Sequence, residues 1–337
     1  MLHTRYTPTI VLILILIIIA LTPTCRLAAV GPIQQPGEPP PASTVPNPPP
    51  TSEPRAELPG AVAVIIDDHA DARPQSGLAV ADLVYEIIAE GGITRFLAFF
   101  YSRNPGDIGP VRSARPYFLQ IVRAYQVPLF HCGGSTEALE LIPRLGIKSV
   151  NELTADRVYF YRAKGRQMPH NLSTSGELIA RATQRKGWVV ALPTLPQGQA
   201  EGGRPVAGVS LEYRAFGWQA VRIDWSLADG RYQRNLNGAV ARDAQGREIV
   251  ADNVIILEVP SRSVTVDGIL LSEVDIIGHG RAWFFSRGRL YEGTWEKSSA
   301  ESHFHYRVGE TEMKFAPGVT WVQVVPDLDK LDVKENS

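Results

Sequence analysis

The sequence contains very little cysteine, since only Cys25 and Cys132 occur among its 337 residues. No internal disulfide can form if Cys25 is acylated or removed with a leader, and an exported fold of this size does not need one. Cys132 adjoins His131, but adjacency in sequence does not create a reactive thiolate. The composition therefore excludes a disulfide-rich scaffold and gives no context for a catalytic cysteine.

The sequence also lacks an excess of charge of either sign. It has 34 Lys and Arg residues against 35 Asp and Glu residues, for a formal net charge of −1. Because there is no basic field, we expect no nucleic-acid partner. The motifs Ser-x-x-Lys, Gly-x-Ser-x-Gly and His-Glu-x-x-His are absent, so the common hydrolase signatures indicate no activity. We expect no cofactor and predict no metal ligands.

The first feature along the chain is an apolar run of 12 residues, Ile10 to Leu21. This run is shorter than the roughly 20 residues of a membrane span and suits the apolar core of a signal peptide. Cys25 follows where a lipoprotein signal places its acylated cysteine, although the three residues before it are not the small ones preferred there. Acylation at Cys25, an uncleaved anchor and cleavage near Ala29 remain open. In each case residues 1–30 are a signal peptide or membrane anchor, and we expect an extracytoplasmic body held at the cell membrane.

A proline-rich linker follows the leader. Residues 31–59 contain 11 prolines, which predicts an extended polyproline spacer without a packed core. The remaining chain is long enough for two ordinary domains. We place their boundary in the Pro- and Gly-rich segment 193–208, which gives domains at 60–200 and 201–330.

The first domain is predicted to be α/β with a mixed sheet. Residues 61–66 form a short apolar run that is typical of a buried strand, and Asp67-Asp68-His69 ends it. Acidic residues at the carboxyl end of a strand are often site residues in α/β sheets. A solvated turn is the alternative interpretation.

A β-hairpin is the clearest local prediction. The runs 83–90 and 93–102 flank Gly91-Gly92, which favours a two-residue loop. In that register Glu86, Glu90 and Arg95 share one face, and the opposite face is apolar core. Glu90 and Arg95 then lie within reach of an ion pair.

Two arginines three residues apart are the main indication of a ligand. Arg112 and Arg115 lie in a Gly/Pro loop immediately before Pro116, a residue suited to the first turn of a helix through Tyr125. Guanidinium groups beside the N–H groups of a helix N-terminus predict a site for phosphate or carboxylate. The alternative is that both arginines cap carbonyls or pair with the acidic residues described above.

Two further loops carry candidate ligand-binding residues. A predicted strand at 127–131 leads through Gly133-Gly134-Ser135 into a helix at 136–145; Ser135 is either part of a phosphate-binding turn or a plain N-cap. The loop 161–171 is basic and contains His170 and Asn171. After it, Thr174 and Glu177 form a capping-box pattern that predicts a helix at 175–186.

The second domain is predicted to be smaller, β-rich and antiparallel. Short alternating runs there are separated by turn signals of the form x-Gly. Most of the tryptophans lie in this half, where they are core residues or stack on sugars. His303 and His305 would face the same side of a strand, but we see no third ligand for a metal nearby.

Motifs along almost the whole body resemble those of the YerB-like family of predicted lipoproteins, which has an N-terminal domain of unknown function and a smaller C-terminal partner domain. The resemblance implies an exported, membrane-anchored protein without a settled activity. Asp68 and Cys132 depart from the family pattern, and the second acid beside Asp67 raises the case for a metal site slightly. The matching segments are 66–69 (IDDH), 72–78 (ARPQSGL), 81–82 (AD), 84–86 (VYE), 90–96 (EGGITRF), 109–117 (GPVRSARPY), His131 with 133–135 (GGS), 169–171 (PHN), 276–278 (IIG), 292–295 (EGTW) and 317–326 (PGVTWVQVVP).

Three functions remain open at this point. The first is binding of an anionic envelope ligand, such as a wall fragment, a polymer or a partner's carboxylate. The second is an envelope hydrolase or transferase that acts on a phosphodiester or glycan. The third is a structural or partner-binding lipoprotein whose charged residues form a buried network. The candidate acid–base residues are Asp67, Glu90 and His131, and the candidate ligand-binding residues are Arg73, Arg95, Arg112, Arg115, Ser135, His170 and Asn171.

Overall fold

The computed structural model describes residues 58, 60–188, 195–213, 220–266 and 268–336. The predicted leader with Cys25 lies outside the described residues, as does nearly all of the predicted linker. Glu53–Ser337 forms one compact unit. In the described part of the chain, no helix is both long and apolar enough to cross a membrane.

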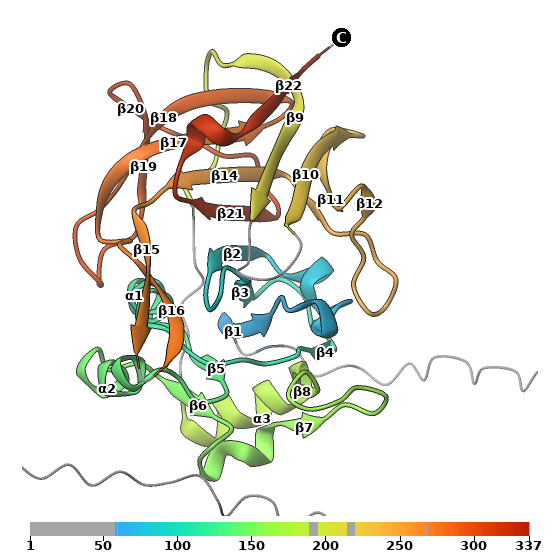
Figure 1. The fold of residues 1–337 in the computed structure, drawn as a ribbon, viewed down its shortest axis with the longest axis vertical. Helices are drawn as coiled ribbons and strands as arrows, with labels where there is room; N and C mark the ends of the chain where they lie inside the picture. Colours follow the sequence, from blue (N-terminus) through green and yellow to red (C-terminus); the bar gives the residue numbers. More distant parts are fainter. Residues whose placement is uncertain (1–57, 59, 189–194, 214–219, 267, 337) are drawn as a thin grey trace, which may run out of the picture. The chain divides into compact units, whose positions relative to one another are not determined.

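A single large mixed sheet runs through both halves of the sequence (Figure 1). Backbone pairing gives the strand order β6-β5-β1-β3-β2-β21-β14-β17-β18-β19-β20. The strands of the N-terminal half are β1 (Val62–Asp67), β2 (Leu83–Ile88), β3 (Thr94–Phe100), β5 (Leu129–His131) and β6 (Ser149–Asn151). Those of the C-terminal half are β14 (Asn253–Glu258), β17 (Gly278–Ser286), β18 (Arg289–Lys297), β19 (His305–Val308), β20 (Thr311–Glu312) and β21 (Thr320–Val325).

The two halves meet where β2 pairs in parallel with β21, from Leu83 opposite Thr320 to Glu86 opposite Gln323. Residues from both halves also contribute to each of the two apolar cores, one on either side of the sheet. Backbone hydrogen bonds of this one sheet join the segments on either side of the predicted domain boundary at 200/201. The boundary itself stays a prediction.

A second set of strands pairs alongside β9 (Arg204–Tyr213), whose first residues also pair with β18. β9 lies between β10 (Val221–Ala228) and β22 (Asp332–Glu335), and β10 continues to β11 (Arg231–Leu236). β11 in turn pairs with the short strands β12 (Ala239–Val240) and β13 (Val250–Ala251). The C-terminal half is thus β-rich as expected, but the parallel β14–β21 pair departs from the predicted antiparallel pattern.

The smaller elements cover the sheet and connect it. A hairpin of β15 (Ser261–Val266) and β16 (Ile269–Val274) extends toward α1 and α2 in Figure 1. β8 (Leu172–Ser175) pairs with β4 (Asp107–Ile108) and β7 (Tyr161–Arg162).

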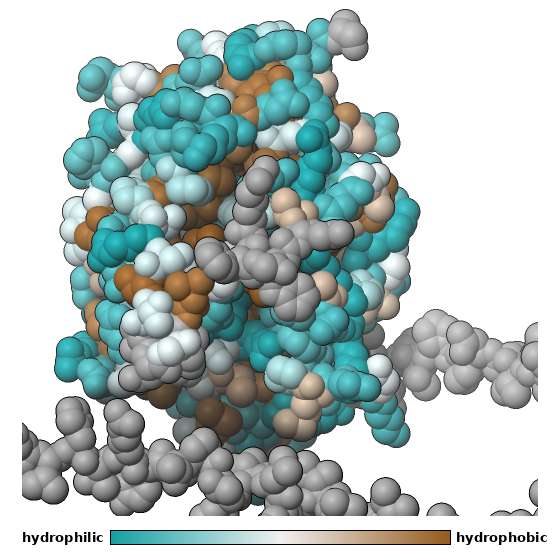
Figure 2. Space-filling model, viewed as in Figure 1, coloured by the Kyte–Doolittle hydropathy of each residue, from teal (hydrophilic) through white to brown (hydrophobic). Residues whose placement is uncertain are grey.

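The coloured part of the face in Figure 2 is largely hydrophilic, with apolar residues in small groups. The 3₁₀ helices are η1 (Ala70–Ala72), η2 (Leu78–Val80), η3 (Ala155–Tyr159) and η4 (Leu328–Lys330).

The three α-helices of the described residues all lie in the N-terminal half: α1 (Pro116–Tyr125), α2 (Thr136–Arg144) and α3 (Gly176–Lys186). Pro116 opens α1 as predicted. The hydroxyl of Ser135 caps α2 by accepting from the N–H of Ala138. The predicted cap of α3 is wrong by one residue, because Ser175 caps it while Thr174 still belongs to β8 and donates to the carbonyl of Tyr159.

The predicted hairpin is present, but its predicted register is wrong by one residue. Its loop has three residues, Glu90 to Gly92, closed by the N–H of Ala89 on the carbonyl of Ile93. Glu86 therefore lies opposite Phe96, and Ile87 lies opposite Arg95. A slip of one residue exchanges the faces of a strand, so Glu86 and Arg95 point to opposite sides of the sheet.

The tryptophans Trp225, Trp295 and Trp321 are almost fully buried. Their rings contact other aromatic side chains, as in the pairs of Trp225 with Trp321 and Trp295 with Phe304. These three residues are core residues, and they offer no exposed face for stacking on a sugar.

Candidate functional site

The carboxyl end of β1 brings charged residues from distant segments together. Asp67 is the last residue of β1, and Asp68 and His69 follow it into η1. The arginine loop runs beside this end, because the N–H of Asp67 donates to the carbonyl of Pro110 and the N–H of Arg112 to that of Ile65. The predicted site residues Asp67 and Arg112 therefore become neighbours.

Asp67 is nearly buried and accepts three hydrogen bonds. Its Oδ1 accepts from the N–H of His69 at 3.1 Å, and its Oδ2 lies 2.8 Å from Nε of Arg112 and 2.6 Å from Nδ1 of His170. Burial raises the pKa of Asp67, but Arg112 and the hydrogen bonds from His170 and His69 outweigh burial and lower that pKa below its usual value. Asp67 is therefore an anion that holds His170 in place.

The contact with Asp67 also assigns the tautomer of His170. A separation of 2.6 Å between Nδ1 and a carboxylate oxygen requires a proton on Nδ1, because two lone pairs repel at that distance. Nη2 of Arg112 lies 3.2 Å from the same nitrogen, so it contributes charge there rather than a second donor to Nδ1. In the neutral ring, Nε2 then keeps its lone pair for a proton, a ligand or a metal ion.

Asp68 belongs to a second, fully satisfied set of contacts. Its Oδ1 accepts from Nε of Arg73 and Nε2 of Gln75, each at 2.9 Å, and its Oδ2 accepts from the hydroxyl of Thr94 at 2.8 Å. The same Thr94 hydroxyl lies 3.2 Å from Glu86. Arg73, predicted to bind a ligand, is thus paired with an acid of its own chain.

Glu86 forms a buried ion pair across the two halves of the chain. Both of its carboxylate oxygens lie 3.1 Å from Nη2 of Arg234, and Nε1 of Trp321 donates to Oε2 at 3.0 Å. Burial raises the pKa of Glu86, Arg234 opposes that shift, and the charge of Asp68 adds to it. Both side chains are buried, so this pair is internal to the fold.

The predicted acid Glu90 lies between two arginines. Arg95 from β3 and Arg115 at the start of α1 each form an ion pair with its carboxylate. Nη1 of Arg95 also donates to the carbonyl of Ser113 at 3.0 Å. Burial lowers the pKa of Arg95 to about 10, with Tyr117 and Asp67 opposing the shift. The geometry here is that of a structural clamp, and the acid–base role of Glu90 stays a prediction.

His131 lies away from these groups and is fully buried. Its Nδ1 lies 2.7 Å from the carbonyl of Gly133, and its Nε2 lies 2.8 Å from Oγ of Ser149. Burial lowers the pKa of His131, and the contact with Gly133 opposes that shift. Both ring nitrogens thus contact groups of the protein itself, and the acid–base role of His131 stays a prediction.

Ser135 and Arg115 line a hollow of ≈ 330 Å³ between α1 and the β15–β16 hairpin, with acidic and basic residues on its walls. Asn171 does not share it. Its side chain accepts from Nη1 of Arg162 and donates to the carbonyl of Arg166. The predicted ligand-binding residues therefore fall into separate groups.

A hollow with a volume of ≈ 710 Å³ includes the predicted site residues Arg73 and His170 in its walls, and we call it the basic hollow. Its walls are Asp71, Arg73, Pro74 and residues 164–170. Arg166 donates to the carbonyls of Ala72 and Pro74, which fixes the loop 164–170 against the one after η1. His170 ends this wall.

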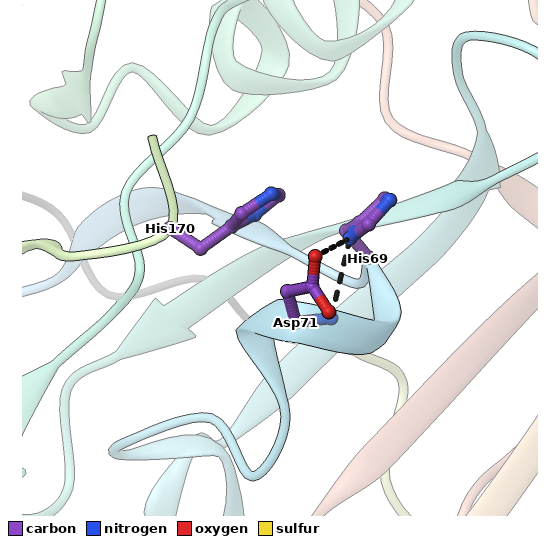
Figure 3. A group of neighbouring side chains, drawn as sticks. All are labelled: His69, Asp71 and His170. Carbon is purple, nitrogen blue, oxygen red and sulfur yellow. Dashed lines mark hydrogen bonds and ion pairs between the residues drawn. The ribbon is translucent and has the colours of Figure 1, made fainter. Parts of the chain in front are cut away.

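Three potential metal ligands meet at the edge of the basic hollow: His69, Asp71 and His170 (Figure 3). Each offers a ligand atom within 4.8 Å of the other two. The imidazole rings stack with centroids 4.5 Å apart, and Nδ1 of His69 lies 3.6 Å from Oδ2 of Asp71.

Sequence reasoning missed His69, Asp71, Arg166 and Arg234 as functional or organising residues. His69 and Asp71 lie two apart after a strand, a spacing that signals nothing until His170 folds beside them. Arg234 is 148 residues from Glu86, and no local pattern indicates that contact.

Comparison with known proteins gives a consistent result. Residues 49–189 match the N-terminal domain, and residues 209–322 the C-terminal domain, of the family described as "Protein of unknown function (DUF3048)". The chain is 31% identical over 280 residues to the Bacillus subtilis (strain 168) protein named "Putative lipoprotein YerB", covering 81% of this chain and 83% of that protein. The crystal structure of YerB from Bacillus subtilis matches with a TM-score of 0.74 and 30% identity, over 82% of this chain and 94% of that one.

Proposed function

The chain belongs to the DUF3048 family, a YerB-like family of unknown function, and on that premise we propose that it is a membrane-tethered protein of the cell envelope that binds an anionic ligand in the basic hollow. The name of its Bacillus relative supports a lipid anchor. The apolar run Ile10–Leu21 and the following Cys25 support the same location, with the proline-rich linker as a spacer.

The observation that carries the ligand proposal is the charge of the basic hollow. Lys164 and Arg166 line it, and in the described part of the chain neither forms an ion pair with a carboxylate. Arg166 uses two of its five N–H donors on backbone carbonyls, so its positive charge has no carboxylate partner and donors remain for an anion. Asp71 is the acidic residue on this wall. A phosphate or carboxylate group fits this excess of positive charge.

The site proposed here differs from the arginine cluster predicted from the sequence. Arg73, Arg112, Arg95 and Arg115 are each paired with an acid of the same chain. These ion pairs compensate the charges of Arg73 and Arg112, whereas Arg95 and Arg115 share the single carboxylate of Glu90. His170 is the predicted ligand-binding residue that remains on the wall of the basic hollow, where Asp67 and Arg112 orient it.

The double variant Lys164→Gln/Arg166→Gln tests the proposal in the full-length chain. Inorganic phosphate, a poly(glycerol phosphate) and muropeptides are titrated while the melting temperature is followed, because a ligand of the folded state raises it by mass action. Each lost charge-assisted hydrogen bond is worth about 1.5–3 kcal/mol, so we expect affinity for the bound anion to fall at least about tenfold.

Arg181→Gln/Arg185→Gln is the matched control, since both arginines are exposed on α3 and their loss changes the net charge equally. The control should bind as the wild type does. If both double variants lost the same affinity for the anion, the change in net charge alone would explain the effect, and the proposal would be contradicted. Absence of any shift with every anion would contradict it as well.

The Asp67–His170 pair favours a second candidate function, an envelope hydrolase. A histidine oriented by a buried carboxylate can act as a general base through Nε2. In that case His170→Gln abolishes hydrolysis of a phosphodiester or glycan substrate. Turnover that is unchanged in His170→Gln would remove this candidate.

A further inference from the structure

We propose that His69, Asp71 and His170 form a binding site for a divalent transition-metal ion of the zinc class. The proposal goes beyond the anion-binding function and does not depend on it, because the metal ion alone tests it. It rests on the donor set, the spacing of the donors, the support behind them and their accessibility.

The donor set is two imidazoles and one carboxylate. Imidazole nitrogen suits zinc and its neighbours among the transition metals, whereas magnesium and calcium prefer all-oxygen ligands. Two histidines with one carboxylate, plus an open position for water, is a set that zinc accepts. The chemistry of the three side chains therefore selects a transition metal over an alkaline-earth ion.

The spacing of the donors fits a shared ion. Ligand atoms about 2.0–2.1 Å from a tetrahedral zinc ion lie roughly 3.4 Å from each other. Nδ1 of His69 and Oδ2 of Asp71 are 3.6 Å apart, and the ligand atoms of all three residues lie within 4.8 Å of one another. Figure 3 shows the imidazole ring of His170 lying beside that of His69. Because the two imidazole rings are stacked at an interplanar angle of 19°, one ring must rotate for both nitrogen lone pairs to point at the same ion.

Two backbone features hold His69 and Asp71 in this arrangement. His69 is the N-cap of η1, and the N–H of Asp71 donates to its Nδ1 at 3.2 Å. The N–H of His69 is itself held by Oδ1 of Asp67. The turn therefore presents the two side chains on the same side of η1 before any ion binds. When an ion binds Nδ1 of His69, a coordinate bond replaces the exposed hydrogen bond from the N–H of Asp71.

His170 has the support typical of a metal-ligating histidine. Its Nδ1 donates to Asp67, which fixes the ring and leaves Nε2 as the coordinating atom. Arg112 in turn holds the same oxygen of Asp67. Asp67 thus supports the ring of His170 from behind and does not contact the ion. The carboxylate that would bind the ion is that of Asp71.

All three side chains have some solvent-exposed surface. The side chain of Asp71 is 74% exposed, and those of His69 and His170 are 16% and 13% exposed. Asp71 and His170 also line the basic hollow. An ion there would neutralise Asp71 and offer an open position to an anionic group in the hollow.

Zinc binding to the full-length chain, stripped with a chelator, tests the proposal by calorimetry and by metal content per chain. The visible absorption of bound Co²⁺ reports the coordination geometry. We expect the wild type to bind one equivalent more than His69→Gln or Asp71→Asn. His279→Gln, which removes an exposed histidine of β17, should retain that equivalent.

Equal zinc content in the wild type and both ligand variants would overturn the metal site. Thermal unfolding of each metal-free variant checks its folding, and Asp71→Asn decides the outcome if His69→Gln does not fold, because Asp71 is exposed. The two proposals fail separately. A wild type without the extra equivalent overturns the metal site, whereas anion binding unchanged in Lys164→Gln/Arg166→Gln overturns the function proposed for the hollow.

Discussion

At the scale of single residues, the molecule pairs its buried charges internally. A guanidinium group removed from water needs a partner of opposite charge, and Glu90 supplies one to both Arg95 and Arg115. Asp67 does the same for Arg112. The arginines that the sequence offers as a ligand site thus form ion pairs within the chain, and their role in binding a ligand stays a prediction.

Asp224 gives a prediction of pH dependence at this scale. Ser210, Arg222 and Lys334 all donate to its carboxylate, and although burial raises the pKa of Asp224, these donors lower it to about 2. The unfolded chain has an ordinary pKa of about 3.9. The ionised carboxylate thus stabilises the fold above about pH 4, and this contribution is lost as the pH falls toward 2.

We expect Asp224→Asn to lower the free energy of unfolding near neutral pH and to flatten its decline between pH 4 and pH 2. Urea unfolding at a series of pH values measures both effects. Glu310→Gln, at an exposed position, is the control and should follow the wild type throughout. If the free energy of unfolding of Asp224→Asn fell between pH 4 and pH 2 as steeply as that of the wild type, other carboxylates would be the cause of the acid sensitivity.

At the scale of elements, a turn decides which residues face each other. Gly91 and Gly92 have φ of +57° and +84°, values that favour glycine. The loop they form with Glu90 sets the register of β2 against β3. It also places the carboxylate of Glu90 between its two arginines. One turn thus positions both the hairpin and the clamp.

Substitution of Gly91 separates backbone strain from crowding, because a Cβ there would meet no atom within 4 Å. We expect Gly91→Ala to lower the free energy of unfolding by about 1 kcal/mol through the left-handed backbone alone. Gly91→Asn should cost less, since asparagine tolerates that conformation. Chemical denaturation measures both. Equal losses of stability in Gly91→Ala and Gly91→Asn would contradict the prediction. The cost would then not depend on how well the new residue tolerates the left-handed backbone conformation.

At the scale of the whole molecule, β2 and β21 join the two halves into one sheet. Glu86 and Trp321 lie on these adjacent strands, and Arg234 reaches them from β11. The guanidinium of Arg234 also packs over the rings of Phe96 and Trp321. The halves thus share a core that contains a paired charge, and we expect them to unfold together.

Arg234→Met tests this coupling. It leaves Glu86 buried without its cation, and loss of one partner of a buried ion pair costs about 3–5 kcal/mol. We expect Glu86→Gln/Arg234→Met to recover part of that loss, because no charge is then buried unpaired. Urea unfolding monitored by tryptophan fluorescence gives both values. A double variant as unstable as Arg234→Met would show that packing of the Arg234 side chain, and not its charge, stabilises the junction.

The sequence by itself determined the features that depend on neighbours along the chain. The apolar run 61–66, the glycine pair at 91–92 and Pro116 each specify a strand, a turn or a helix start through local backbone preferences. The N-cap of α2 at Ser135 follows from the same kind of preference. The resemblance to the YerB-like family, carried by long motifs, is confirmed by the match to both of the family's domains.

The tertiary structure alone decided the features that depend on contacts between distant residues. His170 lies 103 residues from Asp67, and β21 lies more than 200 residues beyond β2, yet both contacts are direct. Such pairings are fixed by which surfaces bury each other, and periodicity along the chain carries no information about them. The hairpin register shows the same limit, because a single extra loop residue moved Arg95 to the other face of the sheet.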